Sequence, residues 1–102
     1  MNAQLVLQFP ASTSADFERF VSFEELLEER LASPSTVDGH DLGCGEFNIF
    51  IFTGEPHSTF QRVLEIANTQ GLSDGMRAGY RRSEDDDYSP LWPQDLTTFS
   101  VS

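Results

Sequence analysis

The chain contains no lysine, because all six of its basic residues are arginine. Schiff-base enzymes and P-loop nucleotide-binding sites each need a lysine, so the sequence excludes both classes. Seventeen acidic residues outnumber the six basic ones and give a formal net charge of -11. Such a surface repels polyanions, so neither nucleic acid nor an anionic membrane is an expected partner. The charge fits a basic protein partner, or it serves only to keep the domain soluble.

Cysteine is almost absent as well. Cys44 is the only cysteine, so no disulfide can form within the chain. No stretch of the sequence approaches the roughly 20 apolar residues that cross a bilayer. Met1–Gln4 shows neither the basic segment nor the apolar segment of a secretory signal. We therefore expect a cytoplasmic protein.

The length of 102 residues fits a single domain that covers 1–102, because two cores of half this size would be unstable alone. Only 38% of the residues are hydrophobic, but nine are phenylalanines, whose rings bury large areas. The segment 83–102 begins with the acidic run Glu84–Asp87 and then shows little pattern. We expect this C-terminal segment to be partly irregular.

Hydrophobic periodicity predicts the order strand, helix, strand, strand, helix, strand. The predicted strands cover residues 3–9, 36–42, 46–53 and 75–82. The predicted helices cover about 14–32, with a break near Ser22, and the stretch from Pro56 to Gly71. This order is that of the ferredoxin-like βαββαβ arrangement, an α+β fold. It predicts a four-stranded antiparallel sheet with both helices on one face and a C-terminal extension.

The first predicted helix begins with a weak capping-box match between Thr13 and Asp16. Four glutamates follow at helical spacing and predict its solvated face: Glu24, Glu25, Glu28 and Glu29. The apolar stripe drifts around the helix, however, so that Glu24 lines up with Phe17.

Large apolar groups occupy both sides of the strand 46–53. They are Phe47, Ile49 and Ile51 on one side, and Phe50 and Phe52 on the other. The helices can cover only one side of the sheet, so Val6, Phe50 and Phe52 are expected on the open face. We expect the segment Tyr88–Trp92 to cover part of that face, or a second copy of the chain to do so in a homodimer.

The densest polar cluster lies before the central strand. It contains Asp38, His40, Asp41 and Glu46, and His57 follows at the start of the second helix. Carboxylates and imidazoles that converge can bind a divalent metal or transfer protons. If 36–42 is extended, Asp38 and His40 share a face and Asp41 points away. The competing interpretation is that Asp38, Gly39 and Asp41 shape a hairpin and that His40 is a surface residue.

Glycines 43 and 45 are expected to form the hairpin turn, with Cys44 between them. A thiol in such a turn can be a nucleophile if His40 or His57 lies near it, or it can be an inert turn residue. One cysteine and two histidines at ordinary spacing do not make a closed zinc site. We therefore assign no catalytic residue, no metal and no cofactor.

Three parts of the chain form a recognisable pattern: Val37–Thr53 with its Gly-His-Asp and Asn-Ile-Phe-Ile stretches, Glu55-Pro56, and Tyr88 followed by Leu91-Trp92-Pro93. They resemble a family of small bacterial proteins with a predicted ferredoxin-like fold. The family has no assigned reaction, so the resemblance implies a fold and no catalytic residue. By size and charge alone, the chain is also similar to immunity proteins that neutralise basic bacterial toxins.

These observations leave two hypotheses about function. The first is a non-enzymatic binding or regulatory domain, of the immunity type, that engages a basic protein partner. The alternative is a small metal-binding domain or enzyme centred on Asp38, His40, Asp41 and His57. A homodimer through the open sheet face is compatible with either.

Overall fold

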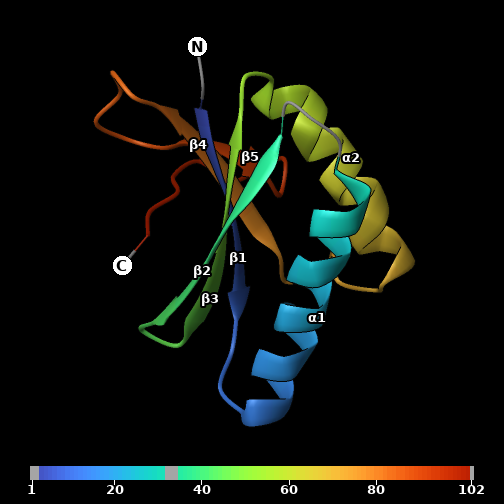
Figure 1. Ribbon diagram of the computed structural model, residues 1–102. Helices are drawn as coiled ribbons and strands as arrows, with labels where there is room; N and C mark the ends of the chain where they lie inside the picture. Colours follow the sequence, from blue (N-terminus) through green and yellow to red (C-terminus); the bar gives the residue numbers. More distant parts are fainter. Residues whose placement is uncertain (1–2, 32–34, 102) are drawn as a thin grey trace.

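The computed structural model describes residues 3–31 and 35–101, and these form five strands and two helices (Figure 1). The strands are β1 (Ala3–Pro10), β2 (Thr36–Gly43), β3 (Glu46–Thr53), β4 (Arg77–Arg82) and β5 (Ser89–Trp92). The helices are α1 (Ser14–Arg30) and α2 (Pro56–Thr69). Within the described ranges, neither helix is long and apolar enough to cross a membrane. The predicted α+β class is confirmed.

The described strands form one antiparallel sheet in the order β2-β3-β1-β4-β5. The sequence predicts four strands, and this number is wrong because Ser89–Trp92 pairs with β4 as a fifth strand. Pro90 lies in the middle of β5 and conceals it in the sequence. Proline cannot donate a hydrogen bond to a neighbouring strand, so it is tolerated at a sheet edge such as this one.

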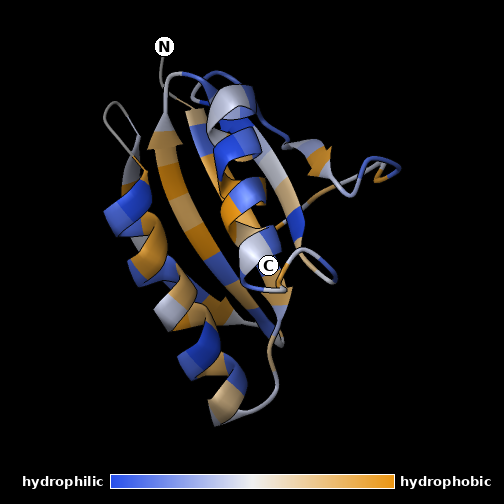
Figure 2. Cartoon of the chain, turned by 90° about the vertical axis from the view of Figure 1, so that its right-hand side faces the viewer, coloured by the Kyte–Doolittle hydropathy of each residue, from blue (hydrophilic) through white to orange (hydrophobic). Residues whose placement is uncertain are grey.

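Both helices lie on the same face of the sheet, as predicted (Figures 1 and 2). The core between the layers is built from residues that face each other across β1 and β3. The pairs are Leu5 with Ile51, Leu7 with Ile49, and Phe9 with Phe47, and all six side chains are buried. The helices add Phe20, Phe23 and Leu27 from α1, and Phe60, Val63 and Ile66 from α2. Burial of each such side chain is worth about 1.5–3 kcal/mol, which drives the two layers together.

The start of α1 follows the predicted capping pattern. The backbone N–H of Asp16 donates to Thr13 Oγ1 at 3.1 Å, and the N–H of Ser12 donates to Asp16 Oδ2 at 3.0 Å. The predicted break near Ser22 does not occur, because α1 is continuous from Ser14 to Arg30. Burial of one stripe of phenylalanines and leucines along the whole helix outweighs the local start signal at Ser22. The predicted end near residue 32 lies outside the described residues.

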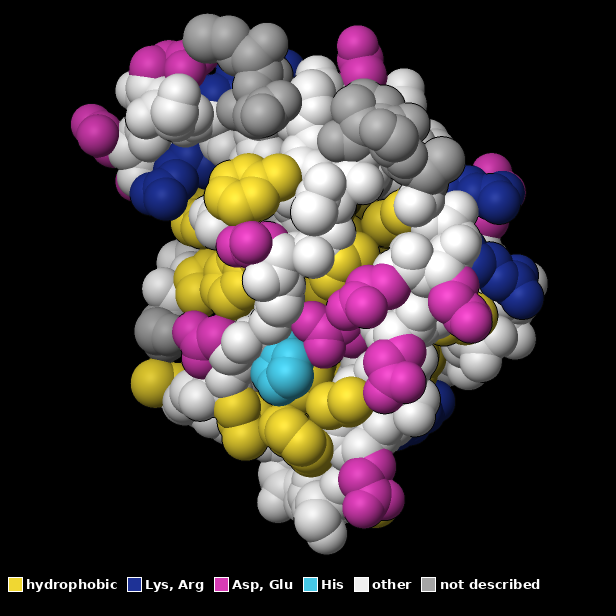
Figure 3. All heavy atoms as spheres, in the orientation of Figure 1, with side chains coloured by type: hydrophobic (Ala, Val, Ile, Leu, Met, Phe, Trp, Pro, Cys, Tyr) yellow, Lys and Arg dark blue, Asp and Glu magenta, His cyan; other side chains and the backbone are white. Residues whose placement is uncertain are grey.

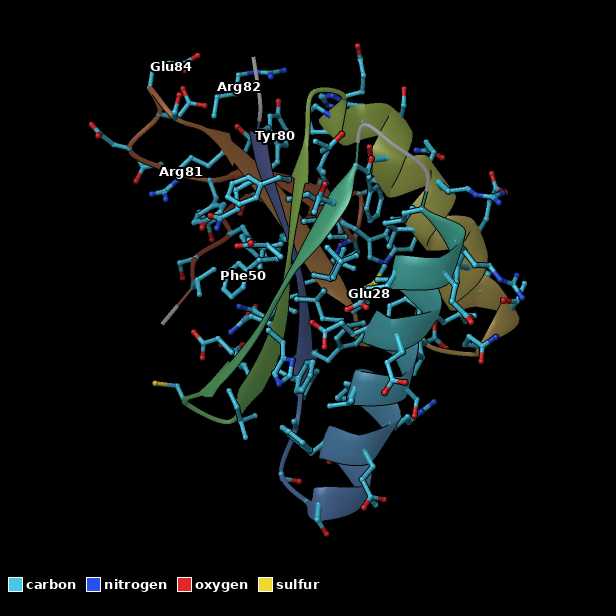
Figure 4. The ribbon with its side chains drawn as sticks, viewed as in Figure 1. Glu28, Phe50, Tyr80, Arg81, Arg82 and Glu84 are labelled. Atoms are coloured by element: carbon cyan, nitrogen blue, oxygen red, sulfur yellow. The ribbon has the colours of Figure 1, made fainter. Side chains whose placement is uncertain are left out.

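The face of the sheet away from the helices is organised in three rows across β3, β1 and β4. They are Phe52, Gln4 and Arg81; Phe50, Val6 and Gly79; and Asn48, Gln8 and Arg77. Residues paired in this way point to the same side of a sheet. Figure 4 shows Phe50 and Arg81 on the side opposite the helices. We call this side the open face.

The C-terminal segment covers the β1–β4 half of the open face. Tyr88 Oη donates a hydrogen bond to Gln4 Oε1 at 2.7 Å. Phe99 lies directly on Gly79, where a Cβ atom would come within 2.5 Å of the phenylalanine ring. The expectation that this segment shields the open face is therefore confirmed for Tyr88, and Phe99 adds to it.

Two hydrophobic residues of the open face differ sharply in exposure. Val6 is fully buried, whereas Phe52 on β3 is 41% exposed. Trp92 does not reach this face, because its indole N–H donates to the Ser73 carbonyl and its ring lies 6.2 Å from that of Phe60 on α2. The β2–β3 half of the open face therefore keeps an exposed aromatic ring.

Candidate functional site

His40 on β2 and Glu24 on α1 form a close polar contact. Their Nδ1 and Oε1 atoms lie 2.8 Å apart, and the side chains are 32% and 7% exposed. A buried carboxylate is costly without a hydrogen-bond partner, so His40 stabilises Glu24 in its position. The sequence assigns Glu24 to the solvated face of the helix, and this is wrong. Glu24 follows Phe20 by four positions and precedes Leu27 by three, so it belongs to the buried stripe.

The His40 ring is held by two phenylalanines. It stacks on Phe47, with ring centroids 4.7 Å apart and an interplanar angle of 17°. Phe17 on α1 meets the same ring edge-on at 5.8 Å. A β-bulge between Val37 and Gly39 sets the register that pairs His40 with Ile49, on the helix side of the sheet. These contacts fix the orientation of the imidazole and join the edge strand β2 to α1.

The other predicted site residues of this cluster lie away from the contact between His40 and Glu24. Asp38 lies within the bulge and is exposed. Asp41 is paired with Asn48, which places it on the open face, and Glu46 begins β3 beside the hairpin turn. The prediction that Asp38 and His40 share a face assumes regular alternation along β2, which the bulge interrupts.

His57 lies apart from this cluster. It is in the first turn of α2, and its ring makes a T-shaped contact with Tyr80 on β4 at 5.1 Å. Strands β3 and β1 separate β4 from β2 in the sheet, so His57 and His40 are on different parts of the molecule. In the part of the chain that the structure describes, no group of three or more His, Cys, Asp or Glu side chains is placed to hold a metal ion.

Cys44 and Gly45 form the two-residue turn between β2 and β3. Their φ angles are 52° and 75°, and a tight hairpin turn with positive φ at both positions matches the twist of the strands. Of the two glycines expected in the turn, Gly45 occupies it and Gly43 ends β2. The Cys44 thiol is exposed at the tip of the hairpin.

An apolar groove of about 520 Å³ lies between this hairpin and the start of α1. We call it the docking groove, and it is lined by Ala11–Ser14, Phe17 and Leu42–Gly45. Phe17 and Leu42 are 36% and 54% exposed. The Ala11 N–H donates to the Gly45 carbonyl at 2.9 Å, which ties the two walls together. Two large hydrophobic side chains thus meet water beside a hollow.

Acidic side chains lie on both elements that form the docking groove, α1 and β2. Figure 3 shows the one visible histidine with hydrophobic side chains on one side and acidic side chains on the others, while the arginines lie toward the margins of the view. Asp16 lies next to Phe17, and Asp38 lies in the bulge of β2, whereas Asp41 is on the open face. The hydrogen bond from the Ser12 N–H lowers the pKa of Asp16, so this carboxylate is charged at neutral pH.

The sequence does not predict that three residues of this region belong to the site: Glu24, Phe17 and Leu42. The alignment of Glu24 with Phe17 is the signal that could have found the first. Leu42 is an isolated apolar residue in a polar run, which is a weaker signal.

The chain matches no protein-family model, no curated protein and no solved structure in the three comparisons. The resemblance to the bacterial family therefore stays a prediction.

Proposed function

We propose that this chain is a protein-binding domain that holds a basic partner in the docking groove. The observation that carries the proposal is the exposure of Phe17 and Leu42, 36% and 54%, beside a hollow of about 520 Å³. Removing a fully exposed large hydrophobic side chain from water contributes about 1.5–3 kcal/mol, and covering the exposed parts of Phe17 and Leu42 contributes a share of this. A partner that places an apolar side chain between Phe17 and Leu42 removes its own side chain from water as well as theirs, and both burials stabilise the complex.

Charge selects the kind of partner. The chain carries a net charge of -11, and Asp16 lies next to Phe17 in the helix that forms one wall of the docking groove. Two copies that met through this surface would bring like charges together, which disfavours a homodimer there. A partner with arginine or lysine around an apolar centre is attracted instead, and salt weakens that attraction.

The walls of the docking groove are set before a partner arrives. Phe17 belongs to α1 and Leu42 to β2, and the contact between His40 and Glu24 fixes these two elements to each other. A groove that is already formed avoids part of the ordering cost of binding.

We also infer that α1, α2 and the strand order β2-β3-β1-β4 make a ferredoxin-like core that β5 extends at one edge. In this arrangement both helices cover one face, so the edge strand β2 and the hairpin tip stay accessible. The analogy of size and charge with immunity proteins fits this picture, with a basic toxin as the partner in a bacterial cytoplasm.

The proposal is tested with labelled peptides in fluorescence anisotropy. A peptide that alternates arginine and leucine should bind more tightly than one of equal length that alternates glutamate and leucine. Salt should weaken the binding, and Phe17→Ser and Leu42→Ser should each weaken it about tenfold, because each loses one buried contact.

Phe52→Ser is the matched control, since Phe52 is 41% exposed but lies on the open face. Equal loss of binding in Phe52→Ser and Phe17→Ser would contradict the proposed location. Light scattering after size exclusion tests the alternative of a second copy. A dimer that Phe52→Ser dissociates would place a self-association surface on the open face.

The contact between His40 and Glu24 favours a second candidate function, proton transfer. A carboxylate on Nδ1 orients the imidazole and leaves Nε2 as the group that exchanges a proton. Hydrolysis of p-nitrophenyl acetate is a simple probe of a reactive histidine. His40→Gln should lower the rate and His57→Gln should not; equal rates in both variants and in the original chain would exclude this role.

A further inference from the structure

A second hollow, of about 390 Å³, lies where β1 ends and β4 begins. We call it the tryptophan hollow. Its apolar wall is formed by Trp92 with Pro10, Met76 and Pro93, and its polar side by Gln8, Glu46, Asp74 and Arg77. Its volume falls within the range of about 300–1,000 Å³ that is usual for small-molecule sites.

The charged groups of the tryptophan hollow have opposite signs. Gln8, Glu46 and Arg77 also line an adjoining hollow of about 260 Å³, so they lie where the two hollows meet. Within residues 3–31 and 35–101, neither Glu46 nor Arg77 takes part in an ion pair. Asp74 adds a second carboxylate to the larger hollow. One guanidinium and two carboxylates are thus available to a ligand.

The polar floor and the aromatic wall are held in place by hydrogen bonds. Gln8 is 3% exposed, and its Nε2 donates to Asn48 Oδ1 at 3.1 Å and to the Ser100 carbonyl at 3.0 Å. The indole N–H of Trp92 donates to the Ser73 carbonyl at 3.3 Å. Asn48 Nδ2 is buried and finds no partner among the described residues.

We propose that the tryptophan hollow binds the ammonium and carboxylate groups of an amino acid, with the apolar side chain of that amino acid against Trp92. The planar guanidinium of Arg77 matches a carboxylate, which it can bind through two parallel hydrogen bonds. Glu46, which lines both hollows together with Arg77, receives the ammonium group.

Simpler ligands fit these charges less well. A simple anion is repelled by the two carboxylates of the hollow and by the net charge of -11, and a simple cation is repelled by the guanidinium of Arg77. A zwitterion satisfies both signs at once. The ligand can be a free amino acid or a short peptide, because the two share this chemistry. The proposal does not depend on the docking groove, which Phe17 and Leu42 line.

The experiment uses the only tryptophan of the chain as its reporter, because Trp92 lies in the tryptophan hollow itself. The intrinsic fluorescence is followed during titration with L-leucine, L-leucinamide, N-acetyl-L-leucine and the dipeptide leucyl-glycine. Calorimetry on the same samples detects binding that leaves the indole emission unchanged. L-Leucine should give a saturable response, while the amide lacks the carboxylate and the acetylated form lacks the ammonium group, so both should bind about tenfold more weakly.

Three variants locate the site. Arg77→Gln and Glu46→Gln should each weaken L-leucine binding about tenfold, because each removes one charge-assisted hydrogen bond. Arg62→Gln is the control, since Arg62 lies on α2 and pairs with Glu65 at the surface. A stronger response to leucyl-glycine than to L-leucine identifies peptides as the source of the ligand, and the reverse order identifies free amino acids.

Three results would overturn the proposal. They are the absence of a saturable signal at millimolar ligand in both measurements, equal affinity for all four compounds, and equal behaviour of Arg77→Gln and Arg62→Gln.

Discussion

The face of the sheet beneath α1 and α2 is closed by side chains that recur at regular spacing, whereas the opposite face is closed by a few single contacts from the C-terminal segment. Leu5, Leu7 and their partners on β3 are fully buried under the two helices. On the open face, Phe99 rests on Gly79 and Tyr88 bonds to Gln4. The two helices therefore cover one face of the sheet as a continuous layer, whereas the C-terminal segment covers the open face only where Phe99 and Tyr88 contact it.

Both proposed sites lie where these covers end. The docking groove occupies the junction of the hairpin tip with the first turn of α1. The tryptophan hollow lies at the end of β1, beside the C-terminal segment. Side chains that no cover reaches remain free to meet a ligand. If the two faces are closed as described, a substitution beneath the helices should lower the free energy of unfolding more than a substitution on the open face.

The largest effect is expected beneath the helices. Leu7→Ala should lower the free energy of unfolding by about 2–5 kcal/mol, because the continuous layer cannot collapse into the space left behind. Val6→Ala is its neighbour on the open face, also fully buried, and should cost about 1–3 kcal/mol. Urea unfolding of both variants measures the difference. Leu→Ala removes three carbon atoms and Val→Ala two, so the costs are compared per carbon atom removed. An equal cost per carbon atom would mean that the two faces are equally tightly closed.

The next effect concerns the contact between Phe99 and Gly79. Gly79→Ala places a Cβ within 2.5 Å of the Phe99 ring, so the ring must move and stability should fall by about 1–3 kcal/mol. In a Phe99→Ala background most of this penalty should disappear. A double-mutant cycle measured by urea unfolding gives the coupling energy. Additive effects of the two substitutions would mean that Phe99 does not cover Gly79 in solution.

A smaller effect is expected for the hydrogen bond of Tyr88. Tyr88→Phe removes the bond to Gln4 Oε1 and should cost about 1 kcal/mol. Tyr80→Phe is the matched control, because the Tyr80 hydroxyl makes no hydrogen bond among the described residues. Thermal unfolding compares the two variants. Equal shifts in Tm would show that the Tyr88 hydroxyl contributes nothing to closing the open face.

The smallest effect lies at the start of α1 and depends on pH. The Ser12 N–H holds the pKa of Asp16 below its usual value of 3.8, so the unfolded chain takes up this proton more readily than the folded one. The stabilisation by Asp16 is therefore complete above the unfolded pKa and is lost as the pH falls through the lower, folded pKa. The difference in unfolding free energy between the original chain and Asp16→Asn should narrow below pH 3.8. A difference that stays constant in acid would show that the carboxylate charge plays no part in the cap.

Sequence alone determined the features that depend on neighbours along the chain. Alternation in β1 and β3 identified the residues that face the helices, and Thr13 with Asp16 identified the start of α1. The net charge of -11 follows from composition and sets the sign of the charge that the surface attracts. These features follow from the strand and helix periods and from composition, which local residues set.

Only the tertiary structure decided the rest. Tyr88 and Gln4 are 84 positions apart, and the pairing of β5 with β4, like the fit of Phe99 on Gly79, depends on the register of the sheet. The burial of Glu24 required His40 to arrive from β2, and that in turn depended on the bulge. Both sites are made by side chains from separate elements, and no local pattern records which elements will meet once the sheet has formed.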